Sequence, residues 1–589
     1  MLVCTATLAW GVNLPAHTVV IKGTTLYDPS KGGFRDLGLL DVQQIFGRAG
    51  RPGFDTSGEG VIVTEHKKLA HYLSLLTHST PIESQFISNL ADNLNAEVVL
   101  GTVTNVREGA QWLGYSYLHT RMEQNPLAYG LTWEDVRMDP GLLQHRRKLV
   151  REAARTLDGA KMVRFDERSG QLYQTEAGRI ASHFYIKQAS MEIFDEHLRR
   201  HMSMPEVFHM VSHASEFENI SPREDEMAEL ESLQRDRKRA CPIEIKATLG
   251  DKAGKVNLLL QVYISRARMD AFSLVADSSY ISQNCSRICR ALFELCLRRG
   301  WPSLAETLLT LTKTVDLRIW PHQHTLRQFE TTLSPETLYK LEEKRATVER
   351  LWDMAPQEIG SMLRLNTAIG AKVKACLEAL PHISMEAAVQ PITRSVLRVT
   401  VTLTPEFIWR DTQHGNLQRW LVWVEDPVNE HIYHSETFNL SKKQHKEGKQ
   451  HLAFTIPIFE PMPPQYFLRA TSESWLGCET FVELSFDGLI LPRKHPPHTD
   501  LMDLDPLPRS ALNNPQYEAL YEKMFSHFNA IQTQAFHTLF HSDTNVLLGA
   551  PTGSGKTISA ELAMLKMFRD TPGGKCVYIA PLKALNPKP

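Results

Sequence analysis

The chain has 589 residues, enough for about four domains by the usual relation between length and domain count. Its 42% hydrophobic and 22% charged residues are typical of a globular protein, and a formal charge of −2 excludes nucleic-acid binding through overall basicity. No apolar run approaches the roughly 18 residues of a membrane span, and the N-terminus lacks a signal-peptide pattern, so no membrane partner is predicted.

The first segment combines short apolar runs with a pair of arginines. Met1-Leu2-Val3-Cys4 predicts a buried strand, and Val19-Val20-Ile21-Lys22 predicts a second strand. A later run, Gln44-Ile45-Phe46-Gly47-Arg48-Ala49-Gly50-Arg51, places two guanidinium groups on one tight element. Such a pair can neutralise charge that develops on a γ-phosphate, although the same residues could also form a solvated turn.

Helical patterns and one short hairpin follow a linker near Ser79-Thr80-Pro81. A helix is predicted from Leu142 to Leu157, and the runs 162–165 and 172–175 predict a hairpin with its turn at Ser169-Gly170. Helices that end in a small hairpin favour a winged-helix domain.

A long amphipathic helix is predicted over about 280–299. Projected at about 100° per residue, one face is apolar and the other cationic. The apolar face carries Ile281, Cys285, Ile288, Leu292 and Leu295, and the opposite face carries Gln283, Arg287, Arg290 and Arg298. The arginine stripe could bind phosphates or could be a solvated surface. The cysteine spacing favours core packing over zinc binding, and free thiols favour a reducing compartment, the nucleus or the cytosol.

Tight turns and then a period of two follow this helix. Ile369-Gly370-Ala371-Lys372-Val373 predicts a turn whose backbone N–H groups could meet a phosphate, or which could serve packing alone. From about Val389 the apolar residues alternate in several short runs, which predicts a β-sandwich of immunoglobulin or fibronectin type. The proline-rich stretch 492–508 is typical of a linker.

A phosphate-binding loop lies close to the C-terminus. Its residues are Ala550, Pro551, Thr552, Gly553, Ser554, Gly555, Lys556 and Thr557, between the apolar run Val546-Leu547-Leu548 and a helical pattern. A strand, a glycine-rich loop and a helix in this order direct backbone N–H groups at a bound phosphate. Lys556 can then reach the β- and γ-phosphates of ATP, and the Thr557 hydroxyl can ligate Mg²⁺. The predicted cofactors are ATP and Mg²⁺.

Several of these motifs together resemble a Ski-two-like superfamily 2 helicase. The run from Thr5 to Ala16 is similar to motif V of that family, and the run from Gln44 to Pro52 is similar to motif VI. The resemblance implies that Arg48 and Arg51, with Gln44, act as arginine fingers on ATP. It also implies that Thr5, Gly11 and Asn13 couple the nucleotide state to the nucleic-acid backbone.

Further motifs extend the resemblance to the rest of the chain. Phe528 and Gln532 match the Q motif, which implies stacking on adenine by the ring and hydrogen bonds to its edge by the amide. Pro581 and Lys583 match motif Ia, which touches the strand backbone. The helix near 280–299 is similar to the family's ratchet helix, and Arg287 and Arg290 are then its candidate strand contacts.

The implied fold is multidomain, of α/β, α and β parts in succession. A remnant of a C-terminal RecA-like lobe is expected at 1–78, a winged helix at 79–178 and a Sec-sixty-three-homology module at 179–492. That module divides into a helical ratchet at 179–345, a helix-hairpin part at 346–386 and an immunoglobulin-like or fibronectin-like sandwich at 387–492. A linker at 493–510 and a partial N-terminal RecA-like P-loop lobe at 511–589 follow. Because each ATP site is then only half present, the chain is expected to be a fragment of a tandem-cassette helicase.

The implied activity is ATP-driven 3′-to-5′ translocation on, and unwinding of, a DNA or RNA single strand. The chain alone is expected to be a poor ATPase. A non-catalytic scaffold that binds nucleic acid or protein is the alternative. Phrases such as 125–130 and 495–500 resemble the cointegrator-complex branch of the tandem helicases more than the spliceosomal branch, which implies subunits of a cointegrator-type complex as partners.

Overall fold

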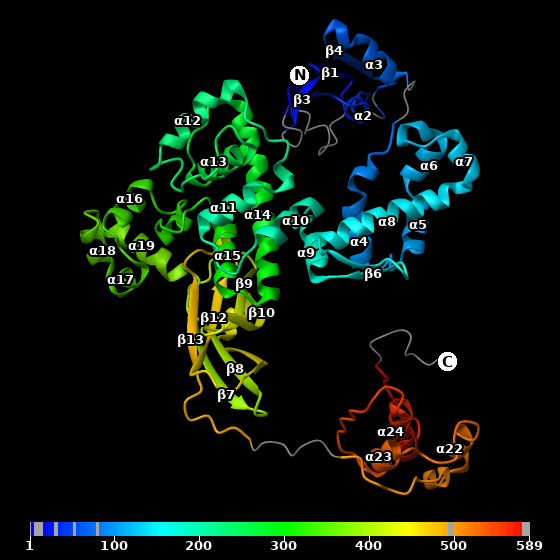
Figure 1. The fold of residues 1–589 in the computed structure, drawn as a ribbon. Coiled ribbons are helices and arrows are strands. Elements are labelled where there is room, and N and C mark those ends of the chain that lie inside the picture. The colour runs from blue at the N-terminus through cyan, green and yellow to red at the C-terminus, as the bar shows by residue number, and fades with distance from the viewer. Residues whose placement is uncertain are drawn as a thin grey trace. The chain divides into compact units, whose positions relative to one another are not determined.

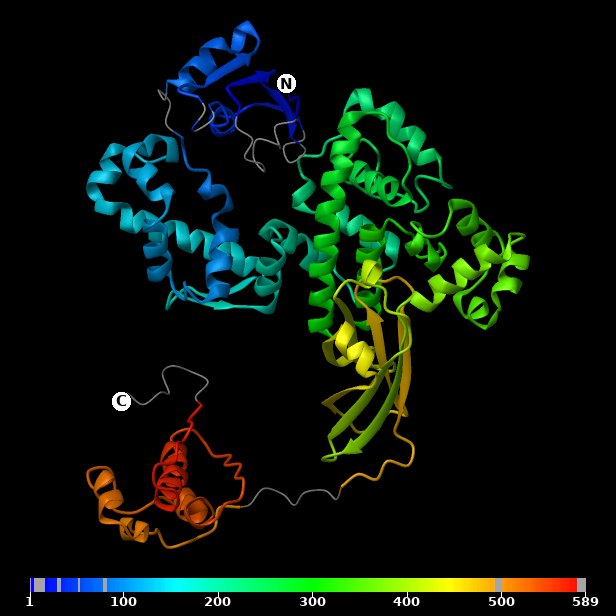
Figure 2. The same ribbon diagram turned by 180° about the vertical axis from the view of Figure 1, so that it is seen from behind.

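The computed structural model describes residues 2–4, 16–28, 33–50, 53, 55–77, 82–492 and 500–579. The chain divides into two compact units, 1–492 and 493–589, and each is described by itself. Figures 1 and 2 show the ribbon from opposite sides.

The N-terminal residues form a small α/β arrangement around a core of Ile21, Leu37, Val42 and Tyr72. Strand β1 (Thr18–Lys22) is one of the two strands predicted here, and it pairs in parallel with β4 (Glu59–Val63). The other elements are β2 (Thr25–Asp28), β3 (Gly33–Asp36), α2 (Leu39–Phe46), η2 (His66–Lys68) and α3 (Leu69–Leu76). The prediction of a buried strand at 1–4 is wrong for the described residues 2–4, which form no strand. Leu2 is 67% exposed and Val3 is 82% exposed.

Residues 82–184 form helices followed by one hairpin, as predicted for a winged helix. The long helix is α8 (Leu143–Gly159), and the hairpin joins β5 (Val163–Asp166) to β6 (Gln171–Gln174) in antiparallel register. The remaining elements are η3 (Phe86–Asn89), α4 (Leu90–Leu100), α5 (Val106–Gly114), α6 (Tyr117–Gln124), η4 (Pro126–Tyr129), α7 (Trp133–Met138), η5 (Pro140–Leu142) and α9 (Glu176–Phe184).

A helical bundle follows, built around α14 (Phe272–Arg299), which is longer than the helix predicted over 280–299. The predicted apolar face is confirmed, because Ile281, Cys285, Ile288, Leu292 and Leu295 are all buried. The other elements are α10 (Gln188–His197), α11 (Met204–Ser212), η6 (Ser215–Phe217), η7 (Glu224–Glu226), α12 (Met227–Arg235), α13 (Lys252–Ser265), α15 (Pro302–Leu317) and η8 (Thr325–Phe329).

Four short helices come next, and glycines allow two of them to pack closely. They are α16 (Pro335–Glu343), α17 (Val348–Asp353), α18 (Pro356–Met362) and α19 (Thr367–Ala379). The turn predicted at 369–373 is instead part of α19. A Cβ on Gly370 would lie 2.0 Å from the Pro356 carbonyl oxygen, so the glycine serves the packing of α19 on α18.

Two antiparallel sheets form the predicted sandwich. The strand order is β10-β9-β12-β13 in one sheet and β11-β8-β7 in the other. Val399 and Val401 of β8 share a core with Trp420 and Val422 of β9, so the sheets pack face to face. The strands are β7 (Ile383–Pro391), β8 (Val396–Pro405), β9 (Leu417–Asp426), β10 (His431–Ser441), β11 (Gln450–Pro457), β12 (Gln465–Ser472) and β13 (Glu479–Ser485), with short helices α20 (Asp411–His414) and α21 (Lys442–Glu447).

The second unit is helical where it is described. Its elements are η9 (Arg509–Leu512), α22 (Pro515–Leu520), α23 (Ala530–His541) and α24 (Lys556–Asp570). The strands predicted on either side of α24 do not form: 546–548 and 577–579 are extended without pairing, and Leu547 is 99% exposed. The described part of this unit offers these runs no neighbouring strand, so their backbone groups have no sheet to join. None of the described helices is both long and apolar enough to cross a membrane.

Candidate nucleotide and strand sites

The glycine-rich loop and the helix after it have the geometry of a phosphate-binding loop, although the described residues 546–548 before them form no strand. Gly553 has φ +84° and Gly555 has φ +83°, left-handed values that glycine adopts without strain. Helix α24 begins directly after them, at Lys556. The loop therefore presents the N-terminus of a 15-residue helix, where unpaired N–H groups and the helix dipole favour an anion.

The side chains of the loop fit a triphosphate. The Lys556 amine curls back over the loop and donates to the carbonyl oxygens of Ala550 and Pro551, both at 2.7 Å. The hydroxyl of Ser554 is buried and has no hydrogen-bond partner among the described residues. It is therefore available to hydrogen-bond a ligand. Thr557 lies exposed in the first turn of α24, where its hydroxyl could hold Mg²⁺ beside the phosphates.

The two residues predicted to contact adenine are both buried and contact other parts of the protein. Phe528 is fully buried and packs against Phe525 and Phe536, so its ring presents no open face to adenine in this structure, and the predicted stacking stays a prediction. Gln532 is 4% exposed. Its Oε1 accepts from the Asn529 backbone N–H at 3.0 Å, and its Nε2 donates to the Gly555 carbonyl oxygen at 3.3 Å. In this structure the Gln532 amide therefore supports the loop.

A further contact holds the loop, and sequence reasoning missed it. Asn529 caps α23 by accepting from the Gln532 N–H, and its Nδ2 donates to the Ser554 carbonyl oxygen at 2.9 Å. Asn529 and Gln532 thus tie the start of α23 to the glycine loop from opposite ends of a capping box. The pattern Asn-x-x-Gln predicts the cap, but nothing local to it identifies Ser554 as a partner.

The N-terminal candidates are only partly described. Gln44 lies exposed near the end of α2, and Arg48 is half-buried in the following turn. That turn is fixed to the start of β1, because Ala16 N–H donates to the Arg48 carbonyl oxygen at 2.9 Å and Gly50 N–H donates to the Ala16 carbonyl oxygen at 2.7 Å. Six predicted site residues lie outside the described residues: Thr5, Gly11, Asn13, Arg51, Pro581 and Lys583.

The two arginines proposed as strand contacts on α14 are both engaged within the protein. Arg287 donates through Nη1 to the carbonyl oxygens of Phe184, at 2.9 Å, and Tyr185. These carbonyls end α9, so Arg287 joins α9 to α14. Arg290 pairs with Glu473 in the turn after β12, and its guanidinium lies 5.1 Å from the centre of the Phe293 ring.

Two more arginines of α14 also form ion pairs within the protein. Arg298 pairs with Glu176 at 3.4 Å, and Arg299 pairs with Asp195 at 2.9 Å. Four arginines of one helix therefore reach the winged helix, α10 and the sandwich. The sequence predicted a cationic face, and the structure shows that acceptors from three other elements line it.

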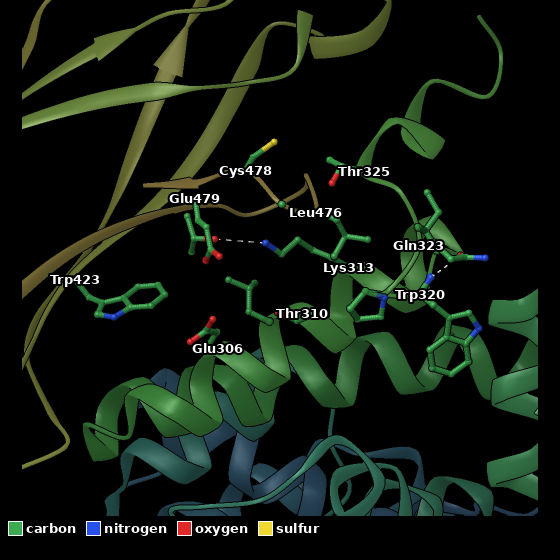
Figure 3. Close-up of a pocket in the computed structure, with 15 residues that line it drawn as sticks. Glu306, Thr310, Lys313, Trp320, Gln323, Thr325, Trp423, Leu476, Cys478 and Glu479 are labelled. Carbon is green, nitrogen blue, oxygen red and sulfur yellow. Dashed lines mark hydrogen bonds between the residues drawn. The ribbon is translucent and has the colours of Figure 1, made fainter. Parts of the chain in front are cut away.

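A buried lysine fixes the sandwich to α15. Lys313 is 5% exposed and donates to the carbonyl oxygens of Ser472, at 2.8 Å, and Trp475, at 3.2 Å. Figure 3 shows its side chain reaching from α15 toward Cys478 and Glu479, which lie where β13 begins. These residues line a cavity of about 190 Å³. Burial lowers the pKa of Lys313 to about 8.

Other contacts surround the same turn of the sandwich. Arg469 pairs with Glu306 of α15 at 3.2 Å, and the Gln328 amide exchanges two 3.0 Å hydrogen bonds with the Leu476 backbone. Burial raises the pKa of the Cys478 thiol to about 12, which keeps it protonated and inert in this wall. Because none of these groups carries a sequence motif, only the tertiary structure reveals the junction.

Comparison with protein-family profiles identifies the family to which the chain belongs. The profile described as "Sec63 Brl domain" matches residues 174–485, more than half of the chain. The chain belongs to the Sec63 Brl domain family. A "Winged Helix-turn-helix domain" profile matches residues 83–163, and a "DEAD/DEAH box helicase" profile matches residues 529–588. Along the chain the profiles therefore follow the order winged helix, Sec63 Brl domain and DEAD/DEAH box helicase.

The chain is also similar to curated proteins along almost all of its length. It is 58% identical over 585 residues to the "DExH-box ATP-dependent RNA helicase DExH14" of Arabidopsis thaliana, covering 99% of this chain and 27% of that protein. It is 56% identical over 587 residues to "Activating signal cointegrator 1 complex subunit 3" of Gallus gallus and 55% identical over 588 residues to that of Homo sapiens, covering 26% of each. The predicted resemblance to the tandem helicases is confirmed, and the chain spans about a quarter of their length.

Proposed function

We propose that this chain is part of an ATP-dependent RNA helicase of the Sec63 Brl domain family. The observation that carries the proposal is the 58% identity over 585 residues to a DExH-box ATP-dependent RNA helicase, which runs through the phosphate-binding loop. DNA is a second candidate for the bound strand, since such motors contact mainly the nucleic-acid backbone.

In this proposal the two ends of the chain belong to RecA-like lobes of successive cassettes. Arg48 and Arg51, with Gln44, act on ATP held by another lobe, and residues 550–557 hold ATP and Mg²⁺ for the second cassette. Thr5, Gly11, Asn13, Pro581 and Lys583 contact the strand, along which the motor moves in the 3′-to-5′ direction while the strand passes α14. The left-handed glycines and the unpartnered Ser554 hydroxyl support the nucleotide assignment.

ATP binding by the full chain tests the loop directly. Lys556→Ala removes the amine that would reach the phosphates, and a charge-assisted contact of this kind changes affinity by about tenfold to a hundredfold. A fluorescent ATP analogue titrated by anisotropy should therefore bind at least about tenfold more weakly to the variant. The control is Lys523→Ala, an exposed lysine outside the loop. Equal affinity in both variants would refute the site.

Hydrolysis by the chain alone should be slow, because Arg48 and Lys556 belong to different cassettes in this proposal. Steady-state phosphate release should stay close to background with and without single-stranded RNA. Robust strand-stimulated hydrolysis that Lys556→Ala abolishes would show a complete ATP site in this chain and overturn that assignment.

A scaffold that binds protein or nucleic acid without hydrolysis is the second candidate. It is favoured by the arginines of α14, which are held by Phe184, Glu473 and other acceptors of the protein itself. In either case we propose subunits of a cointegrator-type complex as partners and the nucleus or the cytosol as location. Crosslinking of photoreactive RNA to residues 272–299 favours the motor. Capture of a complex subunit without RNA crosslinking favours the scaffold.

A further inference from the structure

A second cavity lies in the helical bundle, apart from the nucleotide and strand sites. It has a volume of about 380 Å³ and lies where the end of α12, the end of α13 and the segment between α15 and η8 meet. Trp320 and Gln323, both labelled in Figure 3, line this cavity as well as the one beside Lys313. Its volume falls in the usual range for small-molecule sites.

The lining of this cavity is strongly cationic. It contains Lys238, Arg239, Arg266 and Arg327, with His322, and no carboxylate. Four positive groups around one small space repel each other and raise the local concentration of anions. The lining therefore favours an anionic occupant of high charge density.

Two of the cations are positioned by carboxylates outside the lining. Arg266 pairs with Glu330 and also donates to the Leu317 carbonyl oxygen at 3.1 Å. Arg327 binds both carboxylate oxygens of Glu342, at 2.5 and 2.8 Å. These pairs fix the two guanidinium groups but neutralise only part of the charge.

The other two cations have no such partner. Lys238 and Arg239 are exposed, and no carboxylate within salt-bridge distance of either is present in the described part of the chain. Arg239 contributes only its backbone N–H to Asp236, at 3.0 Å. Their charge is therefore available to a ligand, at the rim of a cavity whose other two guanidinium groups are already oriented by their carboxylates.

The floor of the cavity is rigid. The Trp320 ring stacks on Phe208 and on His322, with centroid distances of 5.9 and 6.2 Å, and its Nε1 donates to Ser265 Oγ at 2.9 Å. Gln323 accepts the Trp320 N–H through Oε1, which leaves its amide NH₂ as a further donor. Because Trp320 is only 3% exposed, it offers no open ring face on which a nucleic-acid base could stack.

We propose that this cavity binds a small anion with several phosphate groups, held by Lys238, Arg239, Arg266 and Arg327. A compact polyphosphate can accept from several donors gathered at one site, whereas a nucleic-acid strand needs a continuous groove and stacking surfaces. The site is separate from the phosphate-binding loop, so it stands or falls independently of ATP binding there.

The test uses the full 589-residue chain in a Lys556→Ala background, so that the phosphate-binding loop does not contribute. The probes are inositol hexakisphosphate and inorganic tripolyphosphate, titrated by calorimetry at fixed ionic strength. Removing both rim cations in Lys238→Ala/Arg239→Ala should weaken binding of each probe by about tenfold or more. Both side chains are exposed, so the fold should be retained. Arg237→Ala is the matched control, an exposed arginine of the same segment that does not line the cavity.

The outcomes separate the proposal from its rivals. Tight binding of either probe that the double variant weakens and the control leaves unchanged supports it. Equal weakening by the control, or binding of sulfate as tight as that of the polyphosphates, would mean general charge attraction and overturns it. Binding of single-stranded RNA through Lys238 and Arg239, with no binding of either probe, would assign the surface to nucleic acid and also overturns it.

Discussion

The region of the winged helix and helical bundle, 82–320, differs sharply from the P-loop region, 500–579, although both are mainly helical. In the first, one continuous core runs from Leu90 to Trp320, and the hairpin strands β5 and β6 pair fully. In the second, the core is small and the apolar runs beside the loop are exposed, with Ile579 87% exposed.

This difference separates features that one short segment determines by itself from features that need a second segment. Gly553, Gly555 and the start of α24 adopt the phosphate-binding geometry without a sheet, because left-handed glycines and a helix terminus are local features. A parallel strand is not local, since all its hydrogen bonds go to neighbouring strands. The loop can therefore adopt its phosphate-binding geometry even though the apolar runs beside it pair with no strand that the structure describes.

The largest effect should come from a single methyl group in the closely packed region. A Cβ on Gly178 would lie 1.9 Å from the Met162 carbonyl oxygen, a backbone atom that no rotamer change can move, and 2.7 Å from Asn95 Oδ1. Gly178→Ala should lower the free energy of unfolding by about 3 kcal/mol, because the backbone of α9 must move away from β5. Thermal unfolding followed by circular dichroism measures the loss.

The matched control for Gly178 is Gly159, also a helical glycine, with no atom within 4 Å of an added Cβ. Gly159→Ala should leave stability unchanged or raise it by up to about 1 kcal/mol. If the two alanine variants unfold together, the region is not as closely packed as its geometry indicates, and the contrast with the P-loop region fails.

A smaller, pH-dependent effect is expected at the junction of the bundle and the sandwich. Burial lowers the pKa of Lys313 to about 8, from 10.5 in the unfolded chain. Between these values the unfolded chain holds more protons than the folded chain, so the free energy of unfolding rises with pH in that window. From pH 8 to 10 the Lys313 contribution should grow by about 2 kcal/mol.

The measurement compares the unmodified chain with Lys313→Met in urea at both pH values. Methionine keeps the length of the side chain and removes the titration, so the difference in unfolding free energy between the two chains isolates Lys313. Glu306, Glu479 and Arg290 surround this lysine but are present in both chains. A difference that stays constant from pH 8 to 10 would contradict the lowered pKa.

The sequence predicted most elements whose pattern is local. The apolar face of α14 follows from its 3.6-residue period, and the sandwich strands follow from their alternation. The loop at 550–557 follows from its glycines. In each case the signal lies within one stretch of chain, and the structure reproduces it.

Predictions that depended on the tertiary contacts of a side chain could not be made from its sequence pattern alone. Phe528 has the aromatic character of an adenine contact, but Phe525 and Phe536 enclose it in the core. Arg287 and Arg290 have the spacing of phosphate contacts, but Phe184 and Glu473 are more than 100 residues away along the chain in each direction. A helical projection shows which face a side chain is on, and it contains no information about what packs against that face.

The arginine stripe itself provides the smallest and most discriminating test. Arg290 and Glu473 are each 19% exposed, whereas Arg298 and Glu176 are 61% and 58% exposed. A double-mutant cycle with alanine should give a coupling energy of about 1 kcal/mol for the first pair and less than about 0.5 kcal/mol for the second, because solvent screens the exposed pair. Arg290 pairs with Glu473 through Oε1, and losing the guanidinium would leave a partly buried carboxylate without its cation. A coupling energy for Arg290 and Glu473 as small as that for Arg298 and Glu176 would mean that this ion pair does not hold Arg290, whose guanidinium would then be available to a strand.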